Sequence, residues 1–304
     1  MRYLVHLRLV ALVLLASFIS ACGGSNSANV APTPTTSPFD VEGGMTMQLV
    51  LAASEVVIGE NRFPLGLIVG GTPARDPNIK IHLQFKHAKN DPDRVRAEAD
   101  AIYRGENLPV GIYVAQVNFE EAGDWNVLAQ VDKGDGKLVY LNPMRINVLE
   151  KSPTPAVGEA APPSDNLTVR DQPDLAKLTS DYAPDEKLYQ LSIREALAQK
   201  KPFVVLFGTP GFCQTATCGP NMVVMKKLQE QYGDKVNFIH VEVYPYPFSE
   251  AFQSRTVVQS MKDWNLQTEP WTFMVDAEGK IFAKYEGGIT FSELEPKLKE
   301  LIES

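Results

Sequence analysis

The sequence predicts two folded domains, an all-β antiparallel sandwich followed by an α/β domain whose mixed sheet is flanked by helices. Two observations support this division. Over residues 44–149 apolar and polar residues alternate at period two, whereas over residues 186–304 apolar runs alternate with helical patterns. A length of 304 residues agrees with about two domains.

The charge of the chain argues against one class of partner. The formal net charge is −8, and no cluster of basic residues stands out. A surface that binds nucleic acid needs such a cluster, so the sequence argues against nucleic acid as a partner.

The first 22 residues have the pattern of a secretory signal. Arg2 and Arg8 flank an apolar run, Leu9–Phe18, that is too short to span a membrane stably. The four residues Ile19–Cys22 resemble a bacterial lipobox, which implies a lipid on Cys22 and an extracytoplasmic, membrane-anchored protein; an ordinary signal peptide or an uncleaved anchor is the alternative. Residues 23–43 are rich in Gly, Ser, Asn, Thr and Pro and predict a flexible tether.

Residues 44–149 contain short alternating runs separated by turn residues. Turns are expected at Glu60-Asn61, Gly70-Gly71 and Lys133–Gly136. The pattern predicts an antiparallel β-sandwich, and Gly123-Asp-Trp125 resembles immunoglobulin-like modules of bacterial surface proteins. The expected strands are Met45–Leu51, Ile79–Phe85, Ile112–Val117, Trp125–Val131 and Met144–Val148.

Histidines and methionines in this domain raise the question of a metal site. His82 and His87 have opposite phase along one strand, so they cannot converge on one ion. Met45 and Met47 are interpreted as core residues rather than copper ligands.

Residues 150–185 form a proline-rich linker, which we expect to be partly ordered against the domain that follows. In that domain, Ser192–Glu195 is a capping box that opens a helix through Ala198. Helices are also expected after Cys218 as far as Gly233, from Ser249 to Trp264, and around Leu294, Leu298 and Leu301. The expected strands are Phe203–Phe207, Val236–Val243, Trp271–Val275 and one ending near Tyr285.

The stretch that carries the chemistry is the end of the buried strand Phe203–Phe207. Gly208, Pro210 and Gly211 break this strand into a loop, and two thiols, Cys213 and Cys218, follow at the start of a helix. Unpaired N–H groups and the helix dipole stabilise a thiolate there, which can act as a nucleophile or a soft metal ligand. With Cys22 lipidated, these are the only remaining thiols, so a disulfide between them is expected.

The spacing of the two cysteines constrains the loop. Residues five apart on a continuous helix point to different faces and exceed the Cα separation of about 7 Å that a disulfide tolerates. Cys213 must therefore lie in a loop that folds back onto the helix start.

The order of these elements, with Pro270 before a strand and Gly287-Gly288 before the last helix, resembles a thioredoxin-fold domain from about Leu188 to Ser304. Together with the lipobox and the β-domain, it is similar to bacterial thioredoxin-domain lipoproteins. The resemblance implies that Pro270 follows a cis peptide bond beside the dithiol and that Pro270, Glu269 and Phe212 contact the substrate.

Three features depart from the thioredoxin pattern. Four residues, not two, separate the cysteines. Two alignments with the thioredoxin motif are possible. In one, Cys218-Gly-Pro matches the exposed thiol and the residues after it. In the other, which we favour, Cys213 is the exposed thiol and Cys218 is the inner, resolving thiol. Leu206 stands where thioredoxins often bury an Asp, and Glu269 precedes Pro270, where a carboxylate is expected to raise the pKa of the thiols.

Three functions are compatible with these residues. The first is thiol–disulfide exchange with extracytoplasmic protein thiols or disulfides, carried out by Cys213 and Cys218 without a cofactor. The second, from a resemblance to Sco-type copper-assembly proteins, is copper binding by Cys213, Cys218 and His240. The third is a non-catalytic binding module that uses an exposed aromatic patch of Tyr244, Tyr246, Phe248 and Trp271.

Overall fold

The structure is a computed structural model that describes residues 39–40 and 46–304. The expected signal peptide, the lipobox with Cys22, most of the tether and Met45 lie outside the described residues. Within the described part of the chain, no helix is long and apolar enough to cross a membrane.

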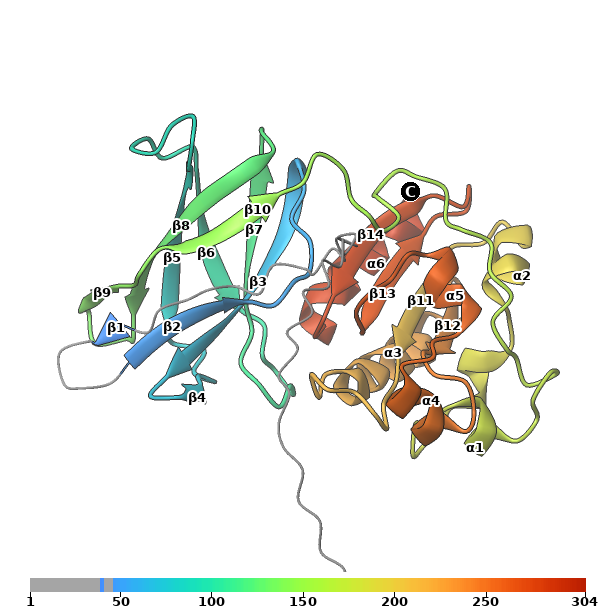
Figure 1. The fold of residues 1–304 in the computed structure, drawn as a ribbon. Coiled ribbons are helices and arrows are strands. Elements are labelled where there is room, and N and C mark those ends of the chain that lie inside the picture. Colours follow the sequence, from blue (N-terminus) through green and yellow to red (C-terminus); the bar gives the residue numbers. More distant parts are fainter. Residues whose placement is uncertain (1–38, 41–45) are drawn as a thin grey trace, which may run out of the picture. The chain divides into compact units, whose positions relative to one another are not determined.

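The N-terminal domain is all-β and antiparallel, as predicted, but it is one sheet rather than two (Figure 1). Its strands follow the order β1-β2-β3-β7-β6-β5-β8-β10, with β4 beside β3 and β9 beside β8, and the sheet is nearly closed into a barrel. The strands are β1 (Phe39–Asp40), β2 (Thr46–Leu51), β3 (Gly59–Val69), β4 (Thr72–Pro73), β5 (Lys80–His87), β6 (Ala97–Tyr103), β7 (Tyr113–Phe119), β8 (Gly123–Asp132), β9 (Leu138–Tyr140) and β10 (Met144–Val148).

The prediction of a β-sandwich is therefore wrong, and strand β6 is the reason. Its first part, from Ala97 to Ala101, pairs with β5, and its end, Ile102 and Tyr103, pairs with β7. One strand thus joins two groups of strands that a sandwich would keep apart. Strand β3 was not among the expected strands, and it contains the Glu60-Asn61 pair that was assigned to a turn.

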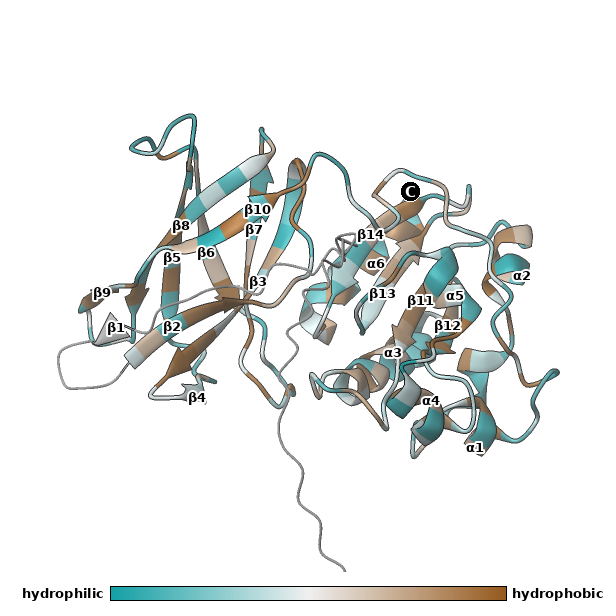
Figure 2. Cartoon of the chain, viewed as in Figure 1, coloured by the Kyte–Doolittle hydropathy of each residue, from teal (hydrophilic) through white to brown (hydrophobic). Residues whose placement is uncertain are grey.

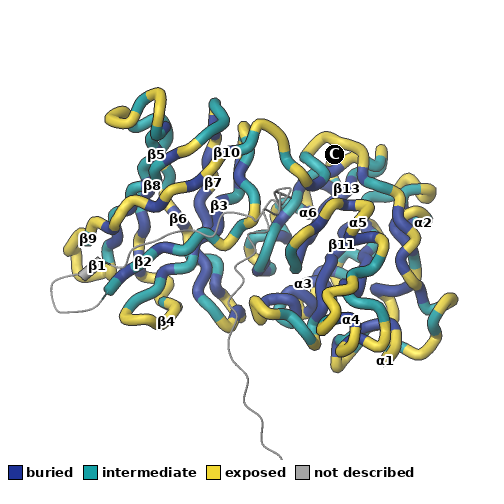
Figure 3. The backbone as a smooth tube through the Cα atoms, in the orientation of Figure 1, coloured by how far each residue is buried: buried dark blue, intermediate teal, exposed yellow. Residues whose placement is uncertain are grey.

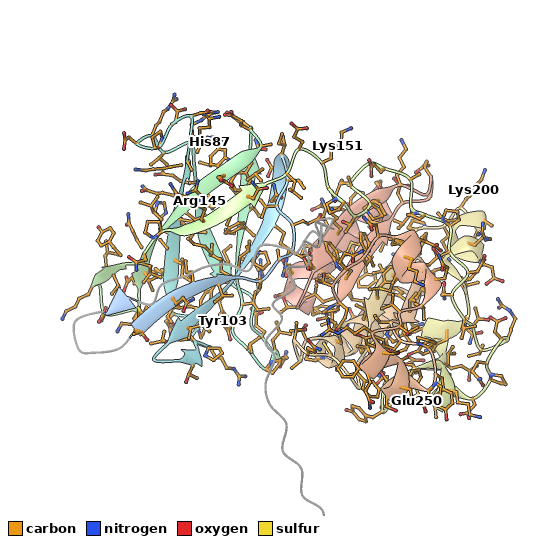
Figure 4. The ribbon with its side chains drawn as sticks, viewed as in Figure 1. His87, Tyr103, Arg145, Lys151, Lys200 and Glu250 are labelled. Atoms are coloured by element: carbon orange, nitrogen blue, oxygen red, sulfur yellow. The ribbon has the colours of Figure 1, made fainter. Side chains whose placement is uncertain are left out.

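The histidines of this domain lie on opposite faces of β5, as predicted. His82 is partly exposed and contacts the Asp100 carboxylate at 2.8 Å. His87, which is labelled in Figure 4, is buried, and its ring lies 5.2 Å from that of Trp125. Met47 is in the core, as expected.

The C-terminal domain has a four-stranded mixed sheet in the order β12-β11-β13-β14. Strand β11 pairs parallel with β12 and antiparallel with β13. The strands are β11 (Phe203–Gly208), β12 (Asn237–Glu242), β13 (Trp271–Val275) and β14 (Ile281–Glu286). The helices are α1 (Leu175–Leu178), a 3-10 turn η1 (Glu186–Tyr189), α2 (Ile193–Ala198), α3 (Cys218–Tyr232), α4 (Phe248–Ser254), α5 (Gln259–Asp263) and α6 (Phe291–Glu303).

Helices cover both faces of this sheet because the side chains of β11 alternate between them. Val204 and Leu206 face α3 and α6, whereas Phe203, Val205 and Phe207 face α2 and α5. All five side chains are fully buried, which places β11 in the centre of the domain (Figures 2 and 3).

The proline-rich segment before this sheet is ordered against the domain, as expected. Ser164 is buried; its hydroxyl accepts a hydrogen bond from the Trp264 indole N–H at 3.2 Å and donates one to Asp263 at 3.0 Å. The side chain of Asn166 accepts a hydrogen bond from the N–H of Ile193. The segment therefore contributes to the domain's packing rather than only connecting two domains.

Candidate active site

The site lies where β11 ends and α3 begins. Helix α3 starts at Cys218 itself, where the sequence predicted a helix to follow the second cysteine. The connecting loop folds back, as the cysteine spacing required: the Gly211 N–H donates to the Ser180 hydroxyl at 3.0 Å, and the Phe212 ring packs 5.5 Å from that of Phe252. These two contacts hold the loop so that Cys213 returns to the start of α3.

Cys213 is half-buried, and its sulfur accepts hydrogen bonds. The backbone N–H of Cys218, one of the unpaired donors at the start of α3, reaches Cys213 Sγ at 3.3 Å, and the Thr215 hydroxyl lies 3.2 Å from it. The neighbouring Cys218 side chain, followed by hydrogen bonds from the Thr215 hydroxyl and the Cys218 N–H, lowers the pKa of Cys213 to about 5, although burial opposes the shift. Cys213 is therefore a thiolate at neutral pH, contrary to the expectation that the nearby carboxylate would raise its pKa.

Cys218 is fully buried behind Cys213. Its thiol donates a hydrogen bond to Glu269 Oε2 at 2.6 Å. Burial, the sulfur of Cys213 and the charge of Glu269 all raise the pKa of Cys218 far above its ordinary value. The two cysteines are free thiols in this structure, so the disulfide expected between them is not formed. Cys213 is the more exposed thiol and Cys218 the inner one, as in the favoured alignment.

Glu269 is the third member of the site. Burial is the main cause that raises the pKa of Glu269 to about 7, while hydrogen bonds from Cys218 and from the backbone N–H of Gln214 oppose the shift. Cys213 Sγ, Cys218 Sγ and a carboxylate oxygen of Glu269 all lie within 4.8 Å of one another. A carboxyl group that titrates near neutral pH is thus in direct contact with the inner thiol.

Pro270 follows a cis peptide bond, as the thioredoxin resemblance implies. Its carbonyl accepts a hydrogen bond from the N–H of Gly287 at 2.9 Å. Asn221 is buried in α3 and links to the same turn: its side chain donates to the carbonyl of Gly287 and accepts from the N–H of Ile289. Asn221 was not among the predicted site residues. Asn is unfavourable in a helix interior, and this could have signalled such a link.

His240 does not join the dithiol, so the copper site expected from Cys213, Cys218 and His240 does not fit the structure. The ring is buried in β12; its Nε2 lies 3.1 Å from the carbonyl oxygen of Gly208, and its Nδ1 lies 2.8 Å from the Tyr189 hydroxyl. Since Nε2 must donate to the carbonyl and Nδ1 accepts from the hydroxyl, neither nitrogen has a lone pair for a metal. Burial also lowers the pKa of His240 to about 4.

The aromatic patch expected for a binding module is not formed as a set. Trp271 is buried in the core and its ring stacks 5.6 Å from that of Phe273, and Phe248 is also buried. Tyr246 is exposed. Leu206, at the position where thioredoxins often bury an Asp, packs in the core beneath α3.

A comparison with protein families agrees with the fold of the C-terminal domain. A thioredoxin-like domain family matches residues 189–302. A thiol:disulfide interchange protein of the thioredoxin family from Chlorobium tepidum TLS is 15% identical, with 50% of this chain and 99% of that chain covered and a TM-score of 0.31. A second Chlorobium tepidum structure, assigned as the thiol:disulfide interchange protein DsbE, is also 15% identical, with 35% and 84% covered and a TM-score of 0.29.

A search of curated proteins found no match. The similarity to both solved structures is low in sequence and in shape. Residues 189–302 form a thioredoxin-like domain that follows a β-rich N-terminal region.

Proposed function

We propose that this protein is an extracytoplasmic, membrane-anchored thiol–disulfide oxidoreductase whose catalytic pair is Cys213 and Cys218. The observation that carries the proposal is the asymmetry of the pair. Cys213 is accessible and stabilised as a thiolate by donors at the start of α3, whereas Cys218 is buried and protonated. An exchange reaction needs this difference between an attacking and a resolving thiol.

The reaction begins at Cys213. Its thiolate attacks one sulfur of a substrate disulfide, which breaks the substrate S–S bond and forms a mixed disulfide, and the released substrate thiolate takes a proton from solvent. The Cys218 thiol then transfers its proton to the carboxylate of Glu269, at 2.6 Å, and attacks Cys213 Sγ. The second substrate thiolate leaves and is protonated by Glu269.

The products are a reduced substrate and a Cys213–Cys218 disulfide, so two electrons pass from the protein to the substrate. In reverse, the same steps oxidise a substrate dithiol. We assign substrate contact to Phe212 and to the segment of Glu269 and Pro270, since both flank Cys213 at the end of β11 and before β13. The partners are protein thiols or disulfides outside the cytoplasm.

The membrane anchor in this proposal depends on the lipobox resemblance at Ile19–Cys22. Its test is to express the full chain in a bacterium fed a labelled fatty acid and to compare it with Cys22→Ser. We expect label in the parent chain and none in the variant. Equal labelling, or a chain that stays in the cytoplasm, would remove the anchor from the proposal without affecting the dithiol.

The exchange reaction is tested by trapping. Cys218→Ser should accumulate mixed disulfides with partner proteins that a reductant releases, because the resolving thiol is missing. Cys213→Ser is the matched control and should trap none. If both variants trap the same proteins, or neither traps any while Cys213 reacts normally with small disulfides, the protein does not carry out exchange.

A further inference from the structure

Three potential metal ligands converge at the start of α3 from two separate segments. Cys213 and Cys218 belong to the loop after β11 and the first turn of α3, and Glu269 precedes β13. Both sulfurs and a carboxylate oxygen lie within 4.8 Å of one another. Ligand atoms on a tetrahedral zinc ion, with bonds of about 2.0–2.3 Å, are separated by roughly 3.3–3.8 Å. The observed cluster is therefore close to the size that one ion requires.

We propose that the reduced form of this site binds Zn²⁺ through Cys213 Sγ, Cys218 Sγ and a carboxylate oxygen of Glu269. Water occupies the fourth position on the side of Cys213 that solvent reaches. The contact between Cys218 Sγ and Glu269 Oε2, now 2.6 Å, opens by about 1 Å to admit the ion. The thiol proton of Cys218 passes to solvent, since only the thiolate is a ligand.

The charge of the site favours a divalent cation. With both thiols ionised and the carboxylate charged, the cluster would carry three negative charges around a buried sulfur, which is unfavourable without a counter-ion. Zn²⁺ cancels two of these charges. Two thiolates and one carboxylate suit zinc, whereas Cu(I) prefers an all-sulfur set.

The surroundings supply hydrogen bonds that hold the ligands in place. Cys213 Sγ accepts a hydrogen bond from the Cys218 N–H and lies beside the Thr215 hydroxyl. Such outer contacts orient metal ligands and support their charge. His240 takes no part, which distinguishes this site from the copper site that the sequence suggested.

Metal binding and disulfide formation exclude each other in this site, because both use the same two sulfur atoms. The oxidised protein therefore has no site, and zinc protects Cys213 from alkylation. The inference does not depend on the proposed exchange reaction: a protein that traps no partner can still bind zinc, and one that exchanges disulfides can fail to bind it.

The test is a Co²⁺ titration of the purified full chain, reduced and freed of metal, followed by displacement with Zn²⁺. We expect one ion per chain, with sulfur-to-cobalt charge-transfer absorption and the intense visible bands of a tetrahedral site. Oxidation of the pair should abolish the signal. Cys213→Ser and Cys218→Ser should lose the charge-transfer absorption or most of its intensity.

Glu269→Gln tests the third ligand and should raise the Kd for Zn²⁺ about tenfold or more. Glu250→Gln, the same change at an exposed position of α4, is the matched control and should leave the Kd unchanged (Figure 4). Since a serine variant can fold poorly, zinc protection of Cys213 from alkylation in the parent chain is a second measurement. Equal cobalt binding by the oxidised form, an unchanged Kd in Glu269→Gln, or binding of Cu(I) but not Zn²⁺ would overturn the inference.

Discussion

Replacing Glu269 with Gln removes the proton acceptor of Cys218 while keeping the size of the side chain. The assay uses an aromatic disulfide that releases a coloured thiolate. The attack of Cys213 releases the first equivalent and forms a mixed disulfide, and the attack of Cys218 on Cys213 releases the second. The two phases separate the two thiols in one experiment.

The structure gives the size of the effect. With a pKa of about 7, Glu269 is ionised in about one tenth of molecules at pH 6, half at pH 7 and nine tenths at pH 8. The second phase should therefore accelerate about fivefold from pH 6 to pH 7 and less than twofold from pH 7 to pH 8. Because the Cys213 charge contributes to the raised pKa and is absent from the mixed disulfide, the inflection lies at or somewhat below pH 7.

In Glu269→Gln the second phase should slow by at least about 100-fold, the lower end of the usual general-base contribution, and lose this inflection. The first phase should change much less, since Glu269 is the last of the main causes that lower the pKa of Cys213. Glu250→Gln should match the parent chain in both phases. A second phase in Glu269→Gln that keeps the parent rate and pH profile would refute the role of Glu269 as base.

Three further predictions concern the pKa values and the buried polar groups. The rate of Cys213 alkylation, measured as a function of pH, should have its midpoint near pH 5. Thr215→Val should raise this midpoint by about one pH unit, since hydrogen bonds to charged groups contribute about 1.5–3 kcal/mol. An unchanged midpoint would exclude Thr215 as a hydrogen-bond donor to Cys213. The pKa of Glu269 is higher in the folded than in the unfolded chain, so the stabilisation from its protonation is complete below about pH 4.5 and is lost as pH rises through 7. In urea unfolding, the free energy of unfolding of Glu269→Gln should therefore gain about 1–2 kcal/mol over that of the parent chain between those two pH values, a figure that includes solvent screening of the partly exposed carboxyl group. A difference that does not change with pH would contradict this. His240→Leu should lower the free energy of unfolding by about 1–3 kcal/mol, because the Tyr189 hydroxyl and the Gly208 carbonyl lose their hydrogen-bond partner. The same variant should leave the Kd for Zn²⁺ unchanged. Weaker zinc binding by a folded His240→Leu variant would show that His240 is a metal ligand after all.

Local patterns in the sequence were sufficient for most of the C-terminal domain. The capping box at Ser192 and Glu195 is present, and β11 and β13 lie within a residue of the expected strands. The helix after the second cysteine ends at Tyr232 with Gly233 as its C-cap, as predicted. These features succeed because caps, buried apolar runs and helix ends depend on residues a few positions apart.

Features that depend on pairing between distant segments were harder to predict. Strand β3 was missed and the sandwich was wrong, since whether β6 joins two groups of strands is decided by hydrogen bonds between separate segments. The long helix expected over Ser249–Trp264 is two short helices, α4 and α5, separated by Arg255 with a left-handed backbone and the residues that follow it.

For the active site, the sequence by itself determined that two thiols stand at the start of a helix after a buried strand, and that Cys213 must lie in a loop folded back onto that helix. Only the tertiary structure decided which thiol is buried and what touches it. Glu269 is 51 residues from Cys218 in the chain, and the antiparallel pairing of β11 with β13 brings it within 2.6 Å of the sulfur. A hydrogen bond at that distance depends on the packing of the whole sheet, which no local pattern records.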